Sequence, residues 1–246
     1  MSYTSFTFND YLSATFASTY DTPLTIVAWV RREASAWAET GLDILVMMGD
    51  DLTDVDNSIG LGTTNGAADS VCITAATTPA GQDISSNATF SDGTYDGVWV
   101  PIIGVWTNAA QRNVYVGDSS TTASDTTSID EGSALDNIIV GRSLNGGLLF
   151  NGYVAEVAVF TSAWSTTLVN QVRTASGTGP APNTIDPTNC IGYWPLAVDQ
   201  ATHSDESGNS GPNMTTAGSV AYSSAHPTII SSIPVFMHHR RMLGMS

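Results

Sequence analysis

Between positions 136 and 160 the apolar residues follow the spacing of two extended strands. A short run, residues 138–140, ends at Gly141, and a second run begins after Asn151 and Gly152. Successive side chains of a strand point to opposite faces, so the period of two in the second run predicts a strand with two distinct faces. We expect one face to carry Tyr153, Ala155, Val157 and Val159, and the other to carry Val154, Glu156, Ala158 and Phe160.

Apolar runs of strand length recur through the first half of the chain, each bounded by turn-forming residues. They cover residues 23–31, 43–48, 58–62, 71–75, 98–106 and 113–117. From Ser165 to Thr174 the spacing is helical instead, with Ser165 placed to cap a short helix whose Leu168, Val169 and Val172 face inward. Many short strands and one helix predict an all-β sandwich, and 246 residues suit one domain of this kind.

The order of glycine, aromatic and acidic residues around the last two strands resembles laminin G-like domains of the concanavalin A-like lectin/glucanase superfamily. The residues that carry this resemblance are Gly141-Arg142, Phe150-Asn151-Gly152, Glu156 and Phe160. The strand at residues 24–31 and a hairpin at residues 96–119 resemble two further segments of the same family. The resemblance implies a concanavalin A-like jelly-roll β-sandwich, and it is nearly silent on function.

Residues 188–224 resemble the segment that normally opens such a domain, although here they follow the helix and a Gly/Pro-rich linker. The matching runs are residues 190–196, 205–209 and 215–220. The first and last strands of a jelly roll can be neighbours, so we predict that this segment supplies terminal strands through a permuted connection. A small separate hairpin module is the alternative. The predicted sandwich therefore covers residues 1–224.

The last 22 residues, Ala225 to Ser246, differ from the rest of the chain in having apolar and basic residues and no acid. Residues 1–224 hold five of the seven arginines and all 23 acidic residues, a net charge of −18, whereas the tail carries +2. This contrast predicts a tail that docks on a neighbouring subunit through side-chain burial and charge. The candidate docking residues are Ile233, Val235, Phe236, Met237, Arg240, Arg241 and Leu243.

The composition narrows the possible partners. The net charge is −16, charged residues make up 12% of the chain, and lysine is absent. Because nucleic-acid binding requires cations against phosphate, this balance argues against a nucleic-acid partner. It favours a solvated, self-repelling surface, as in a salt-adapted or particle-exposed protein. A genome that favours arginine codons would explain the missing lysine equally well.

Targeting and redox features are sparse. The first residues lack a basic segment followed by an apolar core, so we expect a protein made in a cytoplasm without a secretory signal. No apolar run approaches the length needed to span a membrane. The two cysteines, Cys72 and Cys190, lie in apolar strand-like runs, where two buried free thiols are the favoured interpretation and one disulfide is the alternative.

The acidic residues do not form a recognisable catalytic pair. Retaining glycosidases hold two carboxylates on either side of the bond they cleave. The only glutamate on a convincing core strand is Glu156, and no second glutamate lies four positions away. Neither a Gly-x-Ser-x-Gly motif nor another arrangement typical of serine hydrolases occurs. We therefore predict no enzymatic activity and no catalytic residues.

A calcium site is the strongest candidate for metal binding, although we expect that the protein requires no cofactor. The loop after residue 48 places several hard oxygen ligands close together. Laminin G-like domains often bind calcium at a rim of the sandwich, and a second loop carries a further aspartate. The candidate ligands are Asp50, Asp51, Asp54, Asp56 and Asp118. The alternative is a solvated acidic loop, because aspartate is common in turns.

Two classes of function remain. The first is a non-enzymatic structural protein on the surface of a virus particle, of the capsid-decoration or fibre type, which oligomerises in the assembly. It rests on resemblance to stand-alone lectin-like proteins of tailed phages that dock on a capsid or other virion protein through terminal extensions. The second is a carbohydrate-binding adhesin or receptor-binding module for a cell-surface glycan. Its candidate sugar-stacking residues are Trp37 and Trp106.

Overall fold

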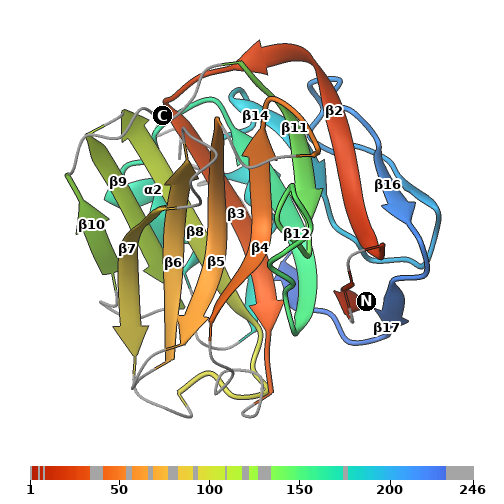
Figure 1. Ribbon diagram of the computed structural model, residues 1–246. Helices are drawn as coiled ribbons and strands as arrows, with labels where there is room; N and C mark the ends of the chain where they lie inside the picture. Colours follow the sequence, from red (N-terminus) through yellow and green to blue (C-terminus); the bar gives the residue numbers. More distant parts are fainter. Residues whose placement is uncertain are drawn as a thin grey trace, which may run out of the picture.

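The structure is a β-sandwich of two antiparallel sheets with a short helix, α2, on its outer side (Figure 1). This computed structural model describes residues 2–4, 6–7, 9–33, 41–53, 57–65, 69–76, 83–90, 94–108, 110–117, 122–126, 134–173 and 177–230. The predicted all-β fold with one short helix is confirmed. No helix in the described ranges is long and apolar enough to cross a membrane.

Sheet A contains seven strands in a continuous order and one additional strand at its centre. In spatial order these seven are β10 (Thr122–Asp125), β9 (Gln111–Val116), β8 (Val100–Asn108), β3 (Leu24–Arg31), β12 (Tyr153–Phe160), β1 (Ser2–Thr4) and β17 (Ala221–Ser223). The additional strand, β14 (Cys190–Trp194), also pairs with β12. Because β12 has β3 on one edge and both β1 and β14 on the other, it is the strand on which the sheet is organised.

Sheet B faces sheet A and contains eight strands. In spatial order they are β15 (Thr202–His203), β16 (Met214–Ala217), β2 (Tyr11–Tyr20), β11 (Leu135–Val140), β4 (Leu42–Gly49), β5 (Ser58–Asn65), β6 (Asp69–Ala76) and β7 (Asp83–Phe90). The segment predicted to provide terminal strands, residues 188–224, contributes to both sheets, because β14 and β17 lie in sheet A while β15 and β16 lie in sheet B. It is therefore part of the sandwich rather than a separate hairpin.

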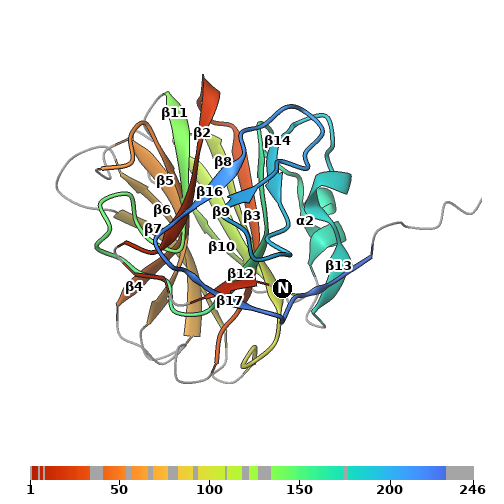
Figure 2. The same cartoon turned by 90° about the vertical axis from the view of Figure 1, so that its right-hand side faces the viewer.

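The hydrophobic core has layers inside and outside the sandwich. The main layer lies between the sheets and includes Ile26 and Val30 of β3 and Trp106 of β8, all without exposed surface. A second layer lies between sheet A and helix α2 (Thr166–Val172), which covers the outer face of that sheet (Figure 2). Strand β3 therefore has both faces buried, which explains why its sequence is almost continuously apolar.

The helix lies where the sequence predicts it, but its capping differs from the expectation. Val169 and Val172 are buried and Leu168 is partly buried, so the predicted inward face is confirmed. Ser165 occupies the N-cap position but makes no side-chain capping hydrogen bond. The preceding residue is held instead, because the Trp164 amide donates to Thr25 Oγ1 of β3 at 3.1 Å. The helix is thus positioned by packing on sheet A rather than by its own cap.

The predicted side-chain faces of residues 153–160 are wrong, because β12 contains a β-bulge. Opposite β3, Ala155 pairs with Trp29 and Ala158 pairs with Val27, so two residues of β12 face the single residue Ala28. An extra residue reverses the alternation of a strand. As a result Val154 shares the inter-sheet core with Val157 and Val159, whereas Ala158 and Phe160 lie under the helix.

The chain after residue 224 continues beside the sandwich, in a separate two-stranded sheet. A short parallel pair joins β18 (Thr228–Ile230) to β13 (Thr178–Pro180), and the Thr228 amide donates to the Gly177 carbonyl at 2.8 Å. A 3₁₀ turn, η1 (Pro182–Thr184), follows β13. The described residues continue six positions past the predicted boundary at 224, which stays a prediction. The candidate docking residues, Ile233, Val235, Phe236, Met237, Arg240, Arg241 and Leu243, lie outside the described residues.

Both cysteines are buried and free, as the favoured interpretation predicts. Burial raises the pKa of the Cys72 thiol well above its usual range. For Cys190, burial is the main cause that raises the pKa to about 12, and its thiol donates to the Gly192 carbonyl. Neither thiol is in the thiolate form that reacts at neutral pH.

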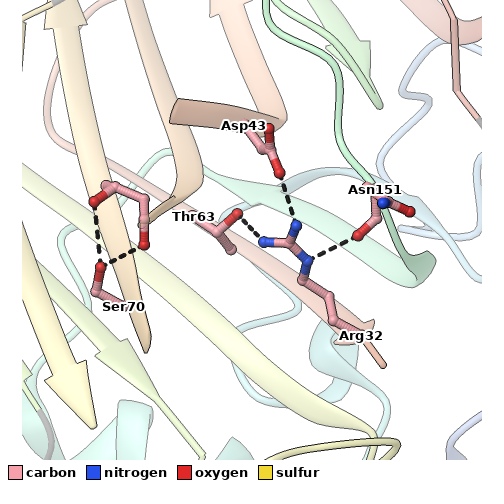
Figure 3. Close-up of polar contacts among 6 residues, drawn as sticks. Arg32, Asp43, Thr63, Ser70 and Asn151 are labelled. Atoms are coloured by element: carbon pink, nitrogen blue, oxygen red, sulfur yellow. Dashed lines mark hydrogen bonds and ion pairs between the residues drawn. The ribbon is translucent and has the colours of Figure 1, made fainter. Parts of the chain in front are cut away.

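The buried side chain of Arg32 joins the two sheets (Figure 3). Arg32, directly after β3 of sheet A, donates from Nη2 to the Asp43 carboxylate of β4 at 2.7 Å and from Nη1 to Thr63 Oγ1 of β5. Its Nε donates to the Asn151 carbonyl, just before β12, at 2.7 Å. Nearby, Ser70 Oγ donates to the Thr64 carbonyl at 2.7 Å. The side chain of Arg32 is only 3% exposed, so little solvent weakens these bonds.

We predict that Arg32→Met lowers the free energy of unfolding by at least about 3 kcal/mol, because it removes a buried charge whose hydrogen bonds to the Asp43 carboxylate and the Asn151 carbonyl connect the two sheets. Urea unfolding followed by circular dichroism would measure the change. The neighbouring Arg31→Met is the matched control, because the Arg31–Glu33 pair is exposed and its loss should cost no more than about 1 kcal/mol. Equal effects of the two substitutions would contradict the bridging role of Arg32.

Candidate functional site

The first candidate site is centred on Glu156, the residue that forms the bulge of β12. Its backbone has a φ of 53°, in the left-handed region that residues other than glycine rarely adopt. Its amide donates to the Pro195 carbonyl at 3.1 Å, a bond made possible because the bulge turns this amide away from β3. Glu156 is 1% exposed, so the bulge places a carboxylate inside the protein. Such a group requires close partners.

Two side chains from distant parts of the sequence supply those partners. The Tyr193 hydroxyl, on β14, donates to Glu156 Oε2. His226, from the segment that precedes β18, places Nε2 at 3.1 Å from Glu156 Oε1. The sequence shows Glu156 only as a single glutamate on a core strand. In the structure its carboxylate binds two side chains, while its amide binds the Pro195 carbonyl.

The ionisation of this trio follows from burial and charge. Burial raises the pKa of Tyr193, and the charge of Glu156 and its hydrogen bond to the phenol raise it further. The phenol therefore stays neutral and donates to the carboxylate. For His226 burial lowers the pKa, but the bond to Glu156, the Pro195 carbonyl and the charge of Glu156 together raise it above the ordinary 6.5. The arrangement places the Glu156 carboxylate between a phenol that is kept neutral and an imidazole whose protonated form it favours.

This trio contains groups that could perform acid–base or nucleophilic chemistry, but they are closed to substrate. Some glycosidases use a tyrosine as nucleophile, so a tyrosine beside a glutamate deserves comparison with them. Tyr193 is 4% exposed and Glu156 is 1% exposed, and the raised pKa of Tyr193 disfavours the phenolate that would attack. The three side chains instead connect β12, β14 and the segment that precedes β18.

The second candidate site is a cavity of about 240 Å³ at the rim of sheet B. It lies between the start of β2, the loop after β4 and the loop that follows β11. Its lining residues are Asn9, Tyr11, Leu52, Thr53, Arg142, Leu144 and Asn145. The Arg142 guanidinium packs 3.8 Å from the centre of the Tyr11 ring, which fixes both side chains in one wall.

Two amides in this cavity are available to a ligand. The Asn145 Oδ1 accepts from Ser143 Oγ at 2.7 Å and from the Gly147 amide at 3.2 Å, which leaves its NH₂ group without a partner in the described part of the chain. The side-chain amide of Asn9 makes no hydrogen bond there either. With Leu52 and Leu144 as an apolar floor, the cavity combines apolar contact with amide donors and acceptors.

Two of the five predicted calcium ligands, Asp50 and Asp51, lie within the described residues. Asp50 accepts a hydrogen bond from Asn57 Nδ2 at 2.9 Å, and Asp51 Oδ1 accepts from the amide and the hydroxyl of Thr53. These are the bonds of an acidic turn. The candidates Asp54, Asp56 and Asp118 lie outside the described residues. Within the described ranges no three His, Cys, Asp or Glu side chains lie close enough to hold a metal ion, so the calcium site stays a prediction.

The predicted stacking role of Trp106 is wrong. The ring has no exposed surface and belongs to the core between the sheets, because β8 turns it toward sheet B. Trp37 lies outside the described residues. Trp99, another tryptophan on sheet A, is 7% exposed and packs against Tyr153 and His226. The tryptophans that the structure describes are structural, as is usual in a sandwich.

Sequence reasoning did not connect the residues of either site. Tyr193 lies within the run CIGYW, whose apolar pattern indicates only a strand, and His226 was assigned to the tail. Tyr11 and Arg142 lie far apart in the sequence and meet because β2 and β11 are neighbours in sheet B. No local signal identifies these contacts. The presence of one glutamate within an apolar strand was the only available indication of a special position.

Comparison with known proteins identifies the family of the chain. The family model described as the concanavalin A-like lectin/glucanases superfamily, a laminin G-like family, matches residues 6–170. The match covers more than half of the chain, so the protein belongs to this family, as the sequence motifs predicted. No curated protein matches the chain.

Several solved structures are similar to this chain at low sequence identity. The heptameric SAP-like pentraxin from Limulus polyphemus has a TM-score of 0.49 and 13% identity, over 72% of this chain and 87% of the pentraxin chain. The enzymatically active domain of tailspike protein 2 of bacteriophage CBA120 has a TM-score of 0.48 and 17% identity, over 74% of this chain and 28% of the tailspike chain. Domain 4 of the Geobacillus stearothermophilus arabinanase AbnA, in complex with arabinotriose, has a TM-score of 0.47 and 13% identity, over 67% and 73% of the two chains. Since each TM-score is below 0.5, the family assignment rests on the sequence match.

Proposed function

We propose that this protein is a non-enzymatic structural protein on the surface of a virus particle, of the capsid-decoration or fibre type. The observation that carries the proposal is the division of charge along the chain. Residues 1–224, with a net charge of −18, contain all the acidic residues, and the terminal segment that follows is apolar and carries +2. Such a charge distribution suits a protein that is displayed in many copies. The negatively charged bodies of the copies repel one another, and the positively charged terminal segment anchors each copy.

The structure adds a physical route for anchoring. The last described residue, Ile230, is 47% exposed, so the described chain ends at the surface of the protein. Residues 231–246 then supply the apolar and basic side chains that a capsid or other virion protein would bind. Copies of the acidic body repel one another, so contact with the particle falls to the tail rather than to the sandwich.

The absence of activity is part of the same proposal. Its support is the closed Glu156 centre, where the carboxylate is bound by Tyr193 and His226 and shielded from solvent. Of the other glutamates in the described ranges, Glu33 is exposed and pairs with Arg31, and Glu206 lies at the surface. Neither forms a carboxylate pair with Glu156 around an accessible bond.

A second candidate function, binding of a cell-surface glycan, is favoured by the rim cavity. Sugars present apolar ring faces and many hydroxyl groups, so a pocket for one sugar unit combines an apolar floor with amide side chains. The cavity provides this through Leu52, Leu144, Asn9 and Asn145. The acidic turn at Asp51 borders it through Thr53, which would bring a bound calcium ion close to the ligand. A virion protein can carry both functions.

We predict that removal of residues 231–246 leaves a folded, β-rich protein that no longer joins the particle. Within the full chain, Phe236→Ala alone should weaken docking at least tenfold, because full burial of such a side chain contributes about 1.5–3 kcal/mol. Co-sedimentation with particles that lack the protein would measure occupancy. Full occupancy by the truncated protein would show that the sandwich is the anchor.

We also predict that the purified protein does not hydrolyse glycans. A panel of β-glucans, arabinans and sialosides can be followed by release of reducing sugar. The Glu156→Gln variant is the control, because it removes the carboxylate and retains a side chain of the same size. Turnover by the native protein that disappears in this variant would refute the non-enzymatic assignment.

For the glycan function we predict that Asn9→Ala reduces binding to any glycan retained on an array by roughly tenfold, since one hydrogen bond to the ligand and its desolvation are lost. Thermal stability should not change, because the Asn9 side chain has no partner in the described part of the fold. Ser204→Ala, at an exposed position outside the cavity lining, is the matched control. Arrays probed with calcium and with a chelator would test the calcium prediction, and the absence of all binding would remove this second function.

A further inference from the structure

The imidazole of His226 has hydrogen-bond acceptors at both of its nitrogens. Nδ1 lies 2.9 Å from the Pro227 carbonyl oxygen. Nε2 lies 3.1 Å from the Pro195 carbonyl oxygen and 3.1 Å from Glu156 Oε1. A neutral imidazole donates from one nitrogen only, whereas an imidazolium donates from both. The surroundings of this ring are therefore complementary to its protonated form.

His226 also lies where the C-terminal segment joins the sandwich. The residues that follow it form β18, which holds to β13 through a parallel pair only three residues long. On the sandwich side, Glu156 and Tyr193 belong to the paired core strands β12 and β14. The contact thus connects a rigid part of the fold to a segment with few attachments of its own.

We propose that His226 and Glu156 form a pH-sensitive latch, which fastens residues 224–230 to the sandwich while the imidazole is protonated and lets them detach once it is neutral. Loss of the proton removes the ion pair and leaves one ring nitrogen facing an acceptor that it cannot satisfy. Because residues 231–246 follow directly, the latch sets the position from which the chain end leaves the sandwich. The latch would act in the same way whatever the chain end binds.

The groups around the ring support a simple two-state titration. Glu156 of β12 is the charged group that faces the ring among the described residues, and Tyr193 of β14 is the titratable group next to it. The Tyr193 pKa is raised, so the phenol stays neutral throughout the relevant range. Glu206 acts on Tyr193 from the following loop, and the Trp99 ring, 6.4 Å from the imidazole, carries no charge.

The direction of the pH effect follows from linkage. The pKa of His226 in the closed state is raised above 6.5, and a detached segment has the ordinary value of 6.5. Below pH 6.5 the ring is protonated in both states, and the stabilisation of the closed state is complete. As the pH rises through the pKa of the closed state, this stabilisation is lost. The segment should therefore be held at acidic pH and released at alkaline pH.

Nuclear magnetic resonance on the intact chain can test both the proton and the detachment. The His226 ring resonances should titrate with a pKa above 6.5. The Thr228 amide, which donates to the Gly177 carbonyl, reports whether β18 is attached. After correction for intrinsic exchange, the opening equilibrium of this amide should rise by up to about tenfold for each pH unit above 6.5 until the pKa of the closed state is passed. The amide of Ile139, in the buried strand β11, should show no such dependence.

Two variants distinguish the latch from a general pH effect. His226→Gln cannot take up a proton, so Thr228 should open to the same extent at pH 6 and pH 9, at the level of the native protein at pH 9. Glu156→Gln keeps an acceptor for Tyr193 but removes the charge, so the His226 pKa should fall relative to the native protein. A native His226 pKa at or below 6.5, equal Thr228 protection at pH 6 and pH 9, or an unchanged pH dependence in His226→Gln would overturn the proposal.

Discussion

The bulge of β12 at Glu156 is the constraint on which sheet A depends. Before the bulge, Val154 pairs with Tyr3 of β1, and after it residues 157–160 pair with β14. The same edge of one strand therefore serves two partners, and the bulge is the point where the partner changes. It also reverses the side-chain alternation, so that Val157 and Val159 enter the core between the sheets while Phe160 meets the helix. A bulge that bends a strand and redirects its side chains is a common way to place a polar group inside a sheet.

The motif that identified the family has mainly structural uses in this chain. A side chain at Gly141, where φ is 93°, would collide with the Phe6 ring, so the close packing of this turn requires glycine. Phe150 lies beneath the Arg32 guanidinium, 5.3 Å from its ring centre, and the Asn151 carbonyl accepts from the same arginine. These contacts fix the course of the chain between β11 of sheet B and β12 of sheet A. The motif therefore identifies the fold and says little about function.

The two candidate sites differ in what they offer to other molecules. The Glu156 centre is closed, and its three side chains come from a core strand, a neighbouring strand and the segment that leads to the chain end. It is suited to holding that segment rather than to binding a substrate. The rim cavity is open and combines the Tyr11–Arg142 wall with amides that have no partner in the described part of the chain. The proposed ligand site and the proposed attachment of the chain end would therefore be separate on this fold.

The sequence alone determined six strands of the first half (β3, β4, β5, β6, β8 and β9), the short helix and the family, and it favoured buried free thiols, because hydrophobic period and turn residues are local properties. It did not predict β2 or β7. It failed where distant segments meet. The period of two around Glu156 concealed a bulge, since the extra residue is evident only opposite its partner Ala28 in β3. Trp106 could be assigned to core or surface only once β8 was placed in the sheet. The contacts of Glu156 with Tyr193 and His226, and of Tyr11 with Arg142, were decided by tertiary structure, because hydrogen bonds and ring contacts between non-adjacent strands leave no periodic signal in the chain.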